Sequence, residues 1–476
     1  MLLRSAIALR MRGLAPPRVA LGAAAAAVFF AGCATVPSGN GMRAVAQLTQ
    51  QRTGVDTGER ERRWPRNAED QAAVRKVVDD ALDKPLGVDD AMRVALLNNP
   101  GLQADYAELG FAAADLIEAG RPRNPGFVFA KLHRGGERQI DRTLFFDVIS
   151  LLTAPWRAQI ASRQFEAAQF GVAQRAVRVS GEARKAWIRA VAAEQSVAYF
   201  AQAREAAEAG AELGQRMAQA GNWPKLTALR EKAFFTDALN GFTRARIAAV
   251  SESEHLARVL GIDDSTRIQL PERLPDLPAG LRDTSDAERV ALDERLDVRA
   301  ARRRLDATAK DLGLTRATRF INVLDLGYQN NSFTENGVGG PKEQGFEVSI
   351  EIPLFDFGAA RMTRAEAVYR QSAGVLAQTV IGAKSEVRER VTNTRNAFEL
   401  ARHYRTEVIP LRKAITDEMT LRYNGMLNSV FELLADSREQ MNAVAATIDA
   451  ERDYWLAEAD LQFALTTGSP MTGNPQ

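Results

Sequence analysis

The sequence predicts a mainly α-helical protein that also contains a β-barrel part and is built from two similar halves. Three observations predict this fold class: long alanine-rich stretches without proline, four short segments in which apolar and polar residues alternate, and a repeat of the whole pattern about 200 residues further along the chain. Hydrophobic residues make up 46% of the 476 residues but aromatic residues only 7%. This composition favours long helices.

The repeat is clearest in one amphipathic helix and its counterpart. A helix expected from Ala95 to Leu116 corresponds to a second one from Ala291 to Leu312. Each is followed by two alternating segments and then by a long helical pattern that is interrupted once, so the order helix, strand, strand, long helix, helix occurs twice. We therefore divide the chain into a leader (1–32), an N-terminal tether and extension (33–84), a first repeat (85–280), a second repeat (281–466) and a C-terminal tail (467–476).

Strict alternation predicts the fourth strand. Phe346, Val348, Ile350 and Ile352 fall on one face, which suits lipid, and the residues between them fall on the other, which suits water. The segment 144–149 is a weaker version with one charge, and the other two strands are expected at 127–132 and at 320–328, with a long polar loop over 330–345. The residues expected to face the water-filled lumen are Asp147, Glu347, Ser349 and Glu351. We hypothesise that the three carboxylates, Asp147, Glu347 and Glu351, favour the passage of cations.

Four strands cannot close a barrel by themselves. An open sheet edge inside lipid would leave backbone groups without hydrogen bonds, so several copies of the chain must cooperate if these strands cross a membrane. The alternative is a water-soluble four-stranded sheet that packs on helices.

Two helical hairpins are expected to reverse at matching places. About sixty residues from Trp156 to Ala220 contain no proline, and at 1.5 Å per residue they would extend roughly 90 Å. Pro224 suits the first turn of a returning helix, and Ser429 can cap the returning helix of the second hairpin. The candidate tip residues are Gly221, Asn222, Trp223, Gly425, Met426, Leu427, Asn428 and Ser429.

The N-terminus has the pattern of an export signal. Four arginines precede an apolar run over 19–31 that is too short for a retained membrane helix, and the run ends at Phe30-Ala31-Gly32-Cys33, which resembles a bacterial lipobox. Cys33 is the single cysteine of the chain, so it is the candidate for acylation. Residues 34 to about 80 lack a clear period and are expected to form an extended tether that leads to a helix.

The sequence carries no sign of catalysis or nucleic-acid binding. The 62 basic and 60 acidic residues nearly cancel, which leaves no strong field for a polyanion. Three scattered histidines have no metal-ligand spacing, no nucleophile motif stands out, and no phosphate-binding glycine loop occurs. We expect neither an enzyme nor a cofactor.

Several motifs in their order resemble the TolC-like outer membrane efflux proteins over residues 85 to 466. The motifs are Asn99-Pro100 in the first helix, Leu260-Gly261 at the end of the first repeat, residues 352–358 (IPLFDFG) at the change from strand to helix, and residues 422–425 (RYNG) at the second hairpin tip. The resemblance implies a homotrimer with a 12-stranded transmembrane barrel and a periplasmic α-barrel. It also implies a location in outer-membrane lipid, and acyl chains such as palmitate on Cys33.

The resemblance further implies a conduit in a tripartite efflux or secretion system. The tips of the helical hairpins would meet a periplasmic adaptor (membrane fusion) protein that is attached to an inner-membrane transporter, and the energy source would lie in that transporter. The alternative is a structural lipoprotein that spans the periplasm and does not conduct. Alternating strand pairs in both repeats favour the conduit, since a passive spacer needs no barrel segments.

Overall fold

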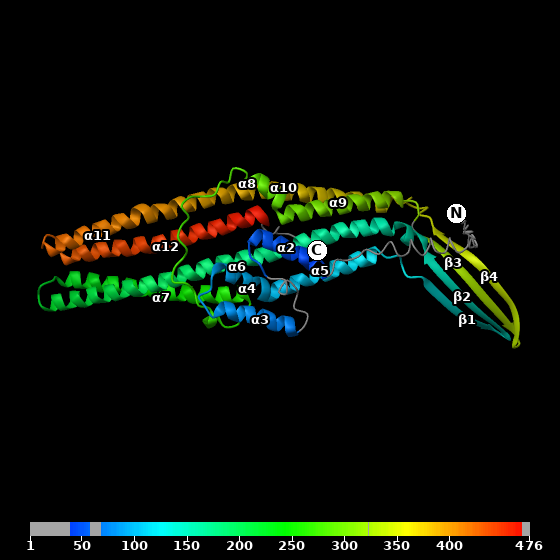
Figure 1. Cartoon of the computed structure of the whole chain (residues 1–476), viewed down its shortest axis with the longest axis horizontal. Helices are drawn as coiled ribbons and strands as arrows, with labels where there is room; N and C mark the ends of the chain where they lie inside the picture. Colours follow the sequence, from blue (N-terminus) through cyan, green and yellow to red (C-terminus); the bar gives the residue numbers. More distant parts are fainter. Residues whose placement is uncertain (1–38, 58–67, 322, 469–476) are drawn as a thin grey trace, which may run out of the picture. The chain divides into compact units, whose positions relative to one another are not determined.

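The computed structural model describes residues 39–57, 68–321 and 323–468, and Figure 1 follows them along the chain. The chain divides into two compact units. Ala112–Gln164 and Asp306–Tyr369 belong to one unit, which contains the β-sheet, whereas Ser38–Phe111, Phe165–Leu305 and Arg370–Gln476 belong to the other, which is helical. Cys33 lies outside the described residues.

The sheet has four antiparallel strands in the order β1-β2-β3-β4. The strands are β1 (Gly126–Arg134), β2 (Glu137–Asp147), β3 (Val323–Glu335) and β4 (Val338–Glu351). Two of them come from each half of the sequence, and the central pair, β2 with β3, joins the halves along eleven residue pairs from Glu137↔Glu335 to Asp147↔Asp325. β1 and β4 each have one neighbour, so both long edges of the sheet are open.

The prediction of a long polar loop over 330–345 is wrong. β3 and β4 continue through this segment and turn at Asn336 and Gly337, both of which have positive φ. Asn, Gly and Pro weaken a strand pattern, but here most residues of the segment pair with the neighbouring strand, with one irregularity between Ser332 and Thr334. That pairing outweighs the weak propensity of single residues.

The helices repeat the order predicted from the sequence. In the first half α5 (Pro100–Ala119) precedes β1 and β2, and α6 (Val148–Gln219) and α7 (Lys225–Leu260) follow them. In the second half α9 (Leu296–Ala317) precedes β3 and β4, and these are followed by α10 (Ala359–His403), a π-helical turn η2 (Tyr404–Val408), α11 (Ile409–Asn424) and α12 (Val430–Thr466). The other helical segments are α2 (Met42–Thr53), α3 (Ala68–Leu82), α4 (Val88–Asn98), the short 3-10 turn η1 (Ser265–Arg267) and α8 (Ala287–Glu294).

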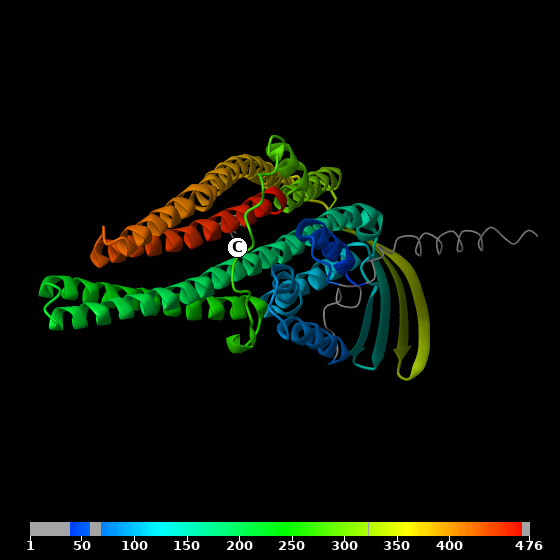
Figure 2. The same ribbon diagram turned by 60° about the vertical axis from the view of Figure 1, so that its left-hand side comes forward.

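Two helical hairpins dominate the helical unit. The views in Figures 1 and 2 agree that α7 runs beside α6 and that α11 runs beside α12. α6 is also tied to α12, because Arg184 donates hydrogen bonds to Glu458 at 2.7 Å and to Gln462 at 2.5 Å. The largest apolar core of this unit includes Trp187 of α6 and Leu260 of α7. In the parts of the chain that the structure describes, no helix has both the length and the apolar character needed to cross a bilayer.

The prediction of an extended tether over residues 34 to about 80 is wrong for two segments, which form α2 and α3. In α2, Val45 and Thr49 are buried, and Val45 joins an apolar cluster with Val172 and Val177 of α6. The apolar positions of α2 are few and are separated by arginines and glutamines, so packing against α6 rather than a strong sequence period stabilises this helix.

The motif Asn98-Asn99-Pro100 holds the end of α7. The Asn98 Nδ2 donates to the carbonyl oxygens of Leu260 at 3.1 Å and Gly261 at 2.8 Å, and the Asn99 Nδ2 donates to Val259 O at 2.9 Å. The last carbonyls of a helix lack partners within the helix, so two amide side chains satisfy them here. Sequence analysis singled out both motifs separately, and the structure brings them into contact.

In the second half, Arg295 holds the end of α12 in the same way. Its guanidinium is buried and donates to Ala464 O in the last turn of α12 at 2.9 Å. Asp297 at 2.8 Å and Glu386 at 2.9 Å neutralise it. Burial alone would lower the pKa of Arg295, but the hydrogen bonds and charges of these two carboxylates raise it above its ordinary value. Each half therefore anchors the end of its returning helix through the segment before α5 or α9.

Replacing Gly261 by alanine should destabilise the helical unit. Gly261 has φ +72° and an added Cβ would lie 2.5 Å from Asn98 O, so Gly261→Ala combines a strained backbone with a clash and should cost more than about 1 kcal/mol. Gly313 of α9 is the matched control, since a Cβ there meets open space. Thermal unfolding followed by circular dichroism should show a lower midpoint for Gly261→Ala only. An equal midpoint for both variants would contradict the anchoring role.

Candidate functional site

The register of the sheet sorts its side chains onto two different faces. Because pairing partners share a face, alternate residues of all four strands can be assigned together. The first set, here called the acid-free face, has no Asp or Glu at any paired strand position. Its residues are Phe127, Phe129, Lys131, His133, Arg138, Ile140, Arg142, Leu144, Phe146, Leu324, Leu326, Tyr328, Asn330, Ser332, Thr334, Gly339, Lys342, Gln344, Phe346, Val348 and Ile350.

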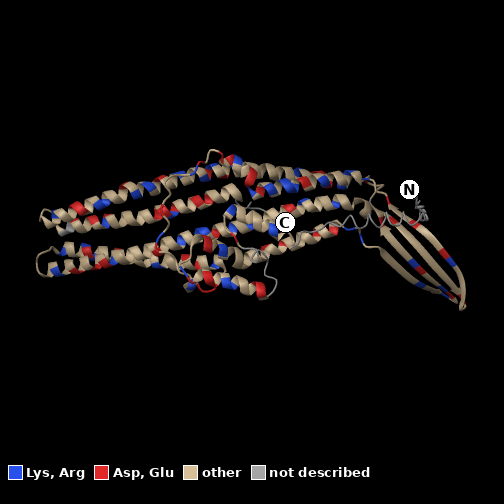
Figure 3. Ribbon diagram, in the orientation of Figure 1, with Lys and Arg blue, Asp and Glu red and all other residues tan. Residues whose placement is uncertain are grey.

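The opposite face, here called the acidic face, carries all the carboxylates of the paired strand residues. These are Glu137, Asp141, Asp147, Asp325, Glu335, Glu343, Glu347 and Glu351, and Arg134 is the one Lys or Arg among its paired residues. Figure 3 shows the charged residues of the strands by sign. The acid-free face is apolar near the helices and open to its surroundings: Phe346 is 80% exposed and Val348 60%. An exposed apolar surface of this kind marks a site of contact with another protein or with a membrane.

The four residues predicted to line a lumen all lie on the acidic face. Glu347 and Glu351 are exposed on β4, and Ser349 is paired with Asp325 of β3. Glu347 accepts a hydrogen bond from Gln329 on the same face. Asp147 differs, because it caps the start of α6: its carboxylate accepts from Ser150 N at 2.7 Å and lies 3.4 Å from Arg123.

The acidic face also contains carboxylates that sequence analysis did not predict. Asp325 lies opposite both Asp147 and Ser349, and Asp141 and Glu343 both pair with Asn331. Their face follows from the register between strands that are distant in sequence, and single-strand alternation does not give that register.

The two hairpin tips differ in what they expose. At the first tip Gly221 has φ +76°, and the Trp223 ring folds back toward Gly214 of α6. At the second tip Gly425 ends α11, and the exposed residues Met426 and Leu427 project. Asn428 lies beside Met419, and Ser429 and Glu432 form a capping box at the start of α12, which confirms the predicted cap. The exposed apolar pair is a candidate docking surface.

A buried ion pair lies behind the tips, where α6, α7 and α12 meet. Glu231 of α7 is 1% exposed and accepts a hydrogen bond from Arg438 of α12 at 2.9 Å. The Arg438 guanidinium also lies 4.5 Å above the Phe234 ring. Gly210 and Gly214 leave room for this contact, because a Cβ at Gly214 would lie 3.4 Å from Glu231 and one at Gly210 would lie 3.5 Å from Leu434. The pair joins the first hairpin to the second.

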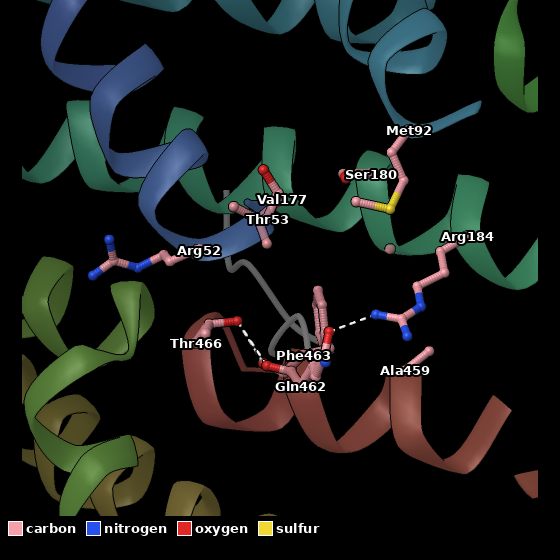
Figure 4. A pocket seen from close by; sticks show the side chains of 11 residues that line it. Arg52, Thr53, Met92, Val177, Ser180, Arg184, Ala459, Gln462, Phe463 and Thr466 are labelled. Atoms are coloured by element: carbon pink, nitrogen blue, oxygen red, sulfur yellow. Dashed lines mark hydrogen bonds between the residues drawn. The ribbon is translucent and has the colours of Figure 1, made fainter. Parts of the chain in front are cut away.

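Two cavities occur in the described part of the helical unit. A pocket of about 40 Å³ between α2, α6 and α12 is lined by Arg52, Ser180 and Gln462 among others (Figure 4), which is room for a water molecule or two. A cavity of about 420 Å³ is lined by Arg405 and Glu451, and burial raises the pKa of Glu451. No group of three His, Cys, Asp or Glu suited to a metal ion occurs among the described residues.

The comparisons agree with this architecture. Residues 289–467 match the family described as outer membrane efflux protein. The chain therefore carries an outer membrane efflux protein domain, on the fold of the TolC-like channels that its sequence resembles. No curated protein sequence matches it as a relative.

Solved structures with this fold include outer-membrane channels. The chain is 20% identical to the outer-membrane channel OprN, with a TM-score of 0.68 over 83% of this chain and 92% of OprN. It is 16% identical to the outer membrane protein VceC from Vibrio cholerae, with a TM-score of 0.64 over 83% and 96% of the two chains. For the MtrE outer membrane channel from Neisseria gonorrhoeae the identity is 18% and the TM-score 0.64, over 79% and 88%.

Substitution of Arg438 should destabilise the helical unit strongly. Arg438→Gln leaves the Glu231 carboxylate buried without its cation and should cost about 3–5 kcal/mol, whereas Glu231→Gln should cost less because Arg438 is partly exposed. The exposed pair Arg422–Glu418 of α11 is the control, and Glu418→Gln should change the free energy of unfolding by about 0.5 kcal/mol or less. Denaturant titration measures all three. If Arg438→Gln and Glu418→Gln unfold alike, the pair does not join the hairpins.

Proposed function

We propose that this chain is the outer-membrane exit duct of a tripartite efflux or secretion system. Three copies complete a 12-stranded barrel, with the acid-free face toward lipid and the acidic face toward a water-filled lumen. The long helices form a duct in the periplasm, and the hairpin tips contact a periplasmic adaptor protein attached to an inner-membrane transporter. The duct performs no chemistry and needs no cofactor.

The separation of the two faces of the sheet carries this proposal. A soluble sheet packed on helices would cover its apolar face with protein, but Phe346, Val348 and Ile350 are exposed in the chain. The opposite face holds eight carboxylates, which require water or counterions. A transmembrane barrel with an aqueous channel needs an apolar outer face and a polar or charged inner face.

The open edges support the presence of several copies. β1 and β4 present unpaired backbone groups along nine and fourteen residues. In hydrocarbon each such group costs several kcal/mol, so neighbouring copies must pair β1 with β4 to close the ring. The number three comes from the resemblance to TolC-like channels.

The tips are proposed to hold the duct closed until an adaptor docks. Met426 and Leu427 offer an exposed apolar contact, and Gly221, Asn222, Trp223, Gly425, Asn428 and Ser429 complete the surface. The Glu231–Arg438 pair would keep the two hairpins together in the resting state. A non-conducting periplasmic spacer, the alternative function, requires neither a sorted sheet nor this contact.

Conductance in a planar bilayer tests the duct. The purified full-length protein should form trimers of low conductance, and Glu231→Gln should raise the conductance because it weakens the contact between the hairpins. Trimers that never conduct, even with Glu231→Gln, would favour the spacer.

The same recordings test the lumen. Replacing Glu347 and Glu351 by glutamine removes two carboxylates per copy from the acidic face, so the channel should lose preference for cations. The reversal potential measured in a salt gradient should therefore shift toward zero. Lys342→Gln, on the opposite face of β4, is the matched control and should leave the reversal potential unchanged. An equal shift for both variants would contradict the assignment of faces.

Acylation of Cys33 is proposed from the lipobox alone. Cys33→Ser removes the single thiol of the chain, so metabolic labelling with a palmitate analogue should be lost completely. Labelled wild-type protein should migrate with outer-membrane fractions. Labelling that persists in Cys33→Ser would refute acylation at this residue.

A further inference from the structure

The acid-free face carries a group of cations next to the hairpin turns. Lys131, Arg138, Arg142 and Lys342, here called the basic band, come from three strands and are all exposed. They are the Lys and Arg residues of the acid-free face, and they lie toward its turn end. Apart from Ile140, which is paired with Lys131, the apolar residues of this face lie toward the ends that continue into α6, α9 and α10. The face therefore changes from apolar to basic along the strands.

The basic band begins directly beyond the apolar residues. Arg142 is two residues from Leu144 on β2, and Lys342 is four residues from Phe346 on β4. At about 3.3 Å per residue these steps are roughly 7 Å and 13 Å along the strand. Strands in transmembrane barrels tilt by about 35–45°, so the depth difference is smaller, about 5–10 Å. That distance takes the cations from hydrocarbon to the level of lipid headgroups.

The basic band has no carboxylate partner among the residues that the structure describes. Arg142 donates a hydrogen bond to Ser332 Oγ at 3.3 Å, and none of the four cations forms an ion pair with any residue that the structure describes. Carboxylates of the strands lie on the opposite face and cannot reach them through the sheet. Cations at a lipid surface without internal partners are suited to bind external anions, and Arg and Lys bind phosphate particularly well.

We propose that the basic band binds the phosphate groups of lipid A in the outer leaflet of the outer membrane. This inference rests on the proposed function, which directs the helices toward the periplasm and hence the turns toward the outer surface. Lipid A carries phosphates on a sugar headgroup above acyl chains, so its phosphates meet the band while its chains cover the apolar residues. In a trimer the band occurs three times around the barrel and organises a ring of lipid A.

Binding of defined lipids to the full-length protein tests the proposal. The quadruple variant Lys131→Gln, Arg138→Gln, Arg142→Gln and Lys342→Gln is compared with a charge-matched control that replaces exposed lysines of the helices, Lys76, Lys225, Lys232 and Lys413, by glutamine. Native mass spectrometry in detergent measures the occupancy of bisphosphorylated lipid A, of lipid A without phosphates, and of phosphatidylglycerol.

We expect bisphosphorylated lipid A to bind the wild type and the control equally, and the quadruple variant at least about tenfold more weakly. Lipid A without phosphates should bind all three proteins weakly, as should phosphatidylglycerol. Equal binding of bisphosphorylated lipid A to wild type and quadruple variant overturns the proposal, and so does phosphatidylglycerol binding as tightly as lipid A.

The same preparations separate this inference from the proposed function. The spectra report whether each protein is trimeric, and planar-bilayer recordings report whether it conducts. A trimeric, conducting quadruple variant that still binds lipid A overturns the inference alone. A wild-type protein that neither trimerises nor conducts overturns the proposed function, and the inference with it.

Discussion

The structure depends on the hydrogen bonds that the backbone of the four-stranded sheet needs at its two open edges. β2 and β3 are paired on both sides, whereas β1 and β4 each leave one side unpaired. In water these groups would be solvated at little cost, but the same strands also expose an apolar face, which the proposed barrel places in hydrocarbon. In that proposed ring of several copies the edges are paired while the apolar face remains outside. A single chain would then supply only part of the hydrogen bonding that its sheet needs.

The sequence duplication provides two similar hairpins that pair with each other in the sheet. Each half contributes one hairpin, and the pairing of β2 with β3 joins hairpins from different halves. The proposed ring repeats this antiparallel pairing between β4 of one copy and β1 of the next. The helical ends show the same relation with different chemistry. Asn98 and Asn99 satisfy the last carbonyls of α7 with neutral amides, whereas Arg295 reaches the last turn of α12 as a buried cation balanced by Asp297 and Glu386. The geometry is retained although the residues are not.

The parts of the fold that follow from local periodicity were predictable, and those that follow from packing between distant segments were not. Alternation over 346–352 identified β4, and Ser429 was recognised as a cap because serine is a preferred first residue before a helix. By contrast, residues 330–345 become strands through pairing with their neighbours, and α2 becomes a helix through contact with α6. Glu231 is a charged residue in an ordinary helical pattern. Its burial results from the space left by Gly210 and Gly214 on another helix.

The absence of carboxylates from the acid-free face, at the paired strand positions, follows from a physical difference between the two kinds of charge. Lys and Arg have long apolar stems, so a residue attached near the edge of the apolar zone can place its charge at the surface while its stem stays in hydrocarbon. Asp and Glu are too short for this, and an anionic leaflet would also repel them. In the proposed duct, bases are therefore tolerated beside the turns, where Lys131 and Lys342 lie, whereas acids are restricted to the face assigned to the lumen. The sorting of charges by face would then reflect the solvents on the two sides of the proposed barrel, and the sorting along the strands would reflect depth in the bilayer.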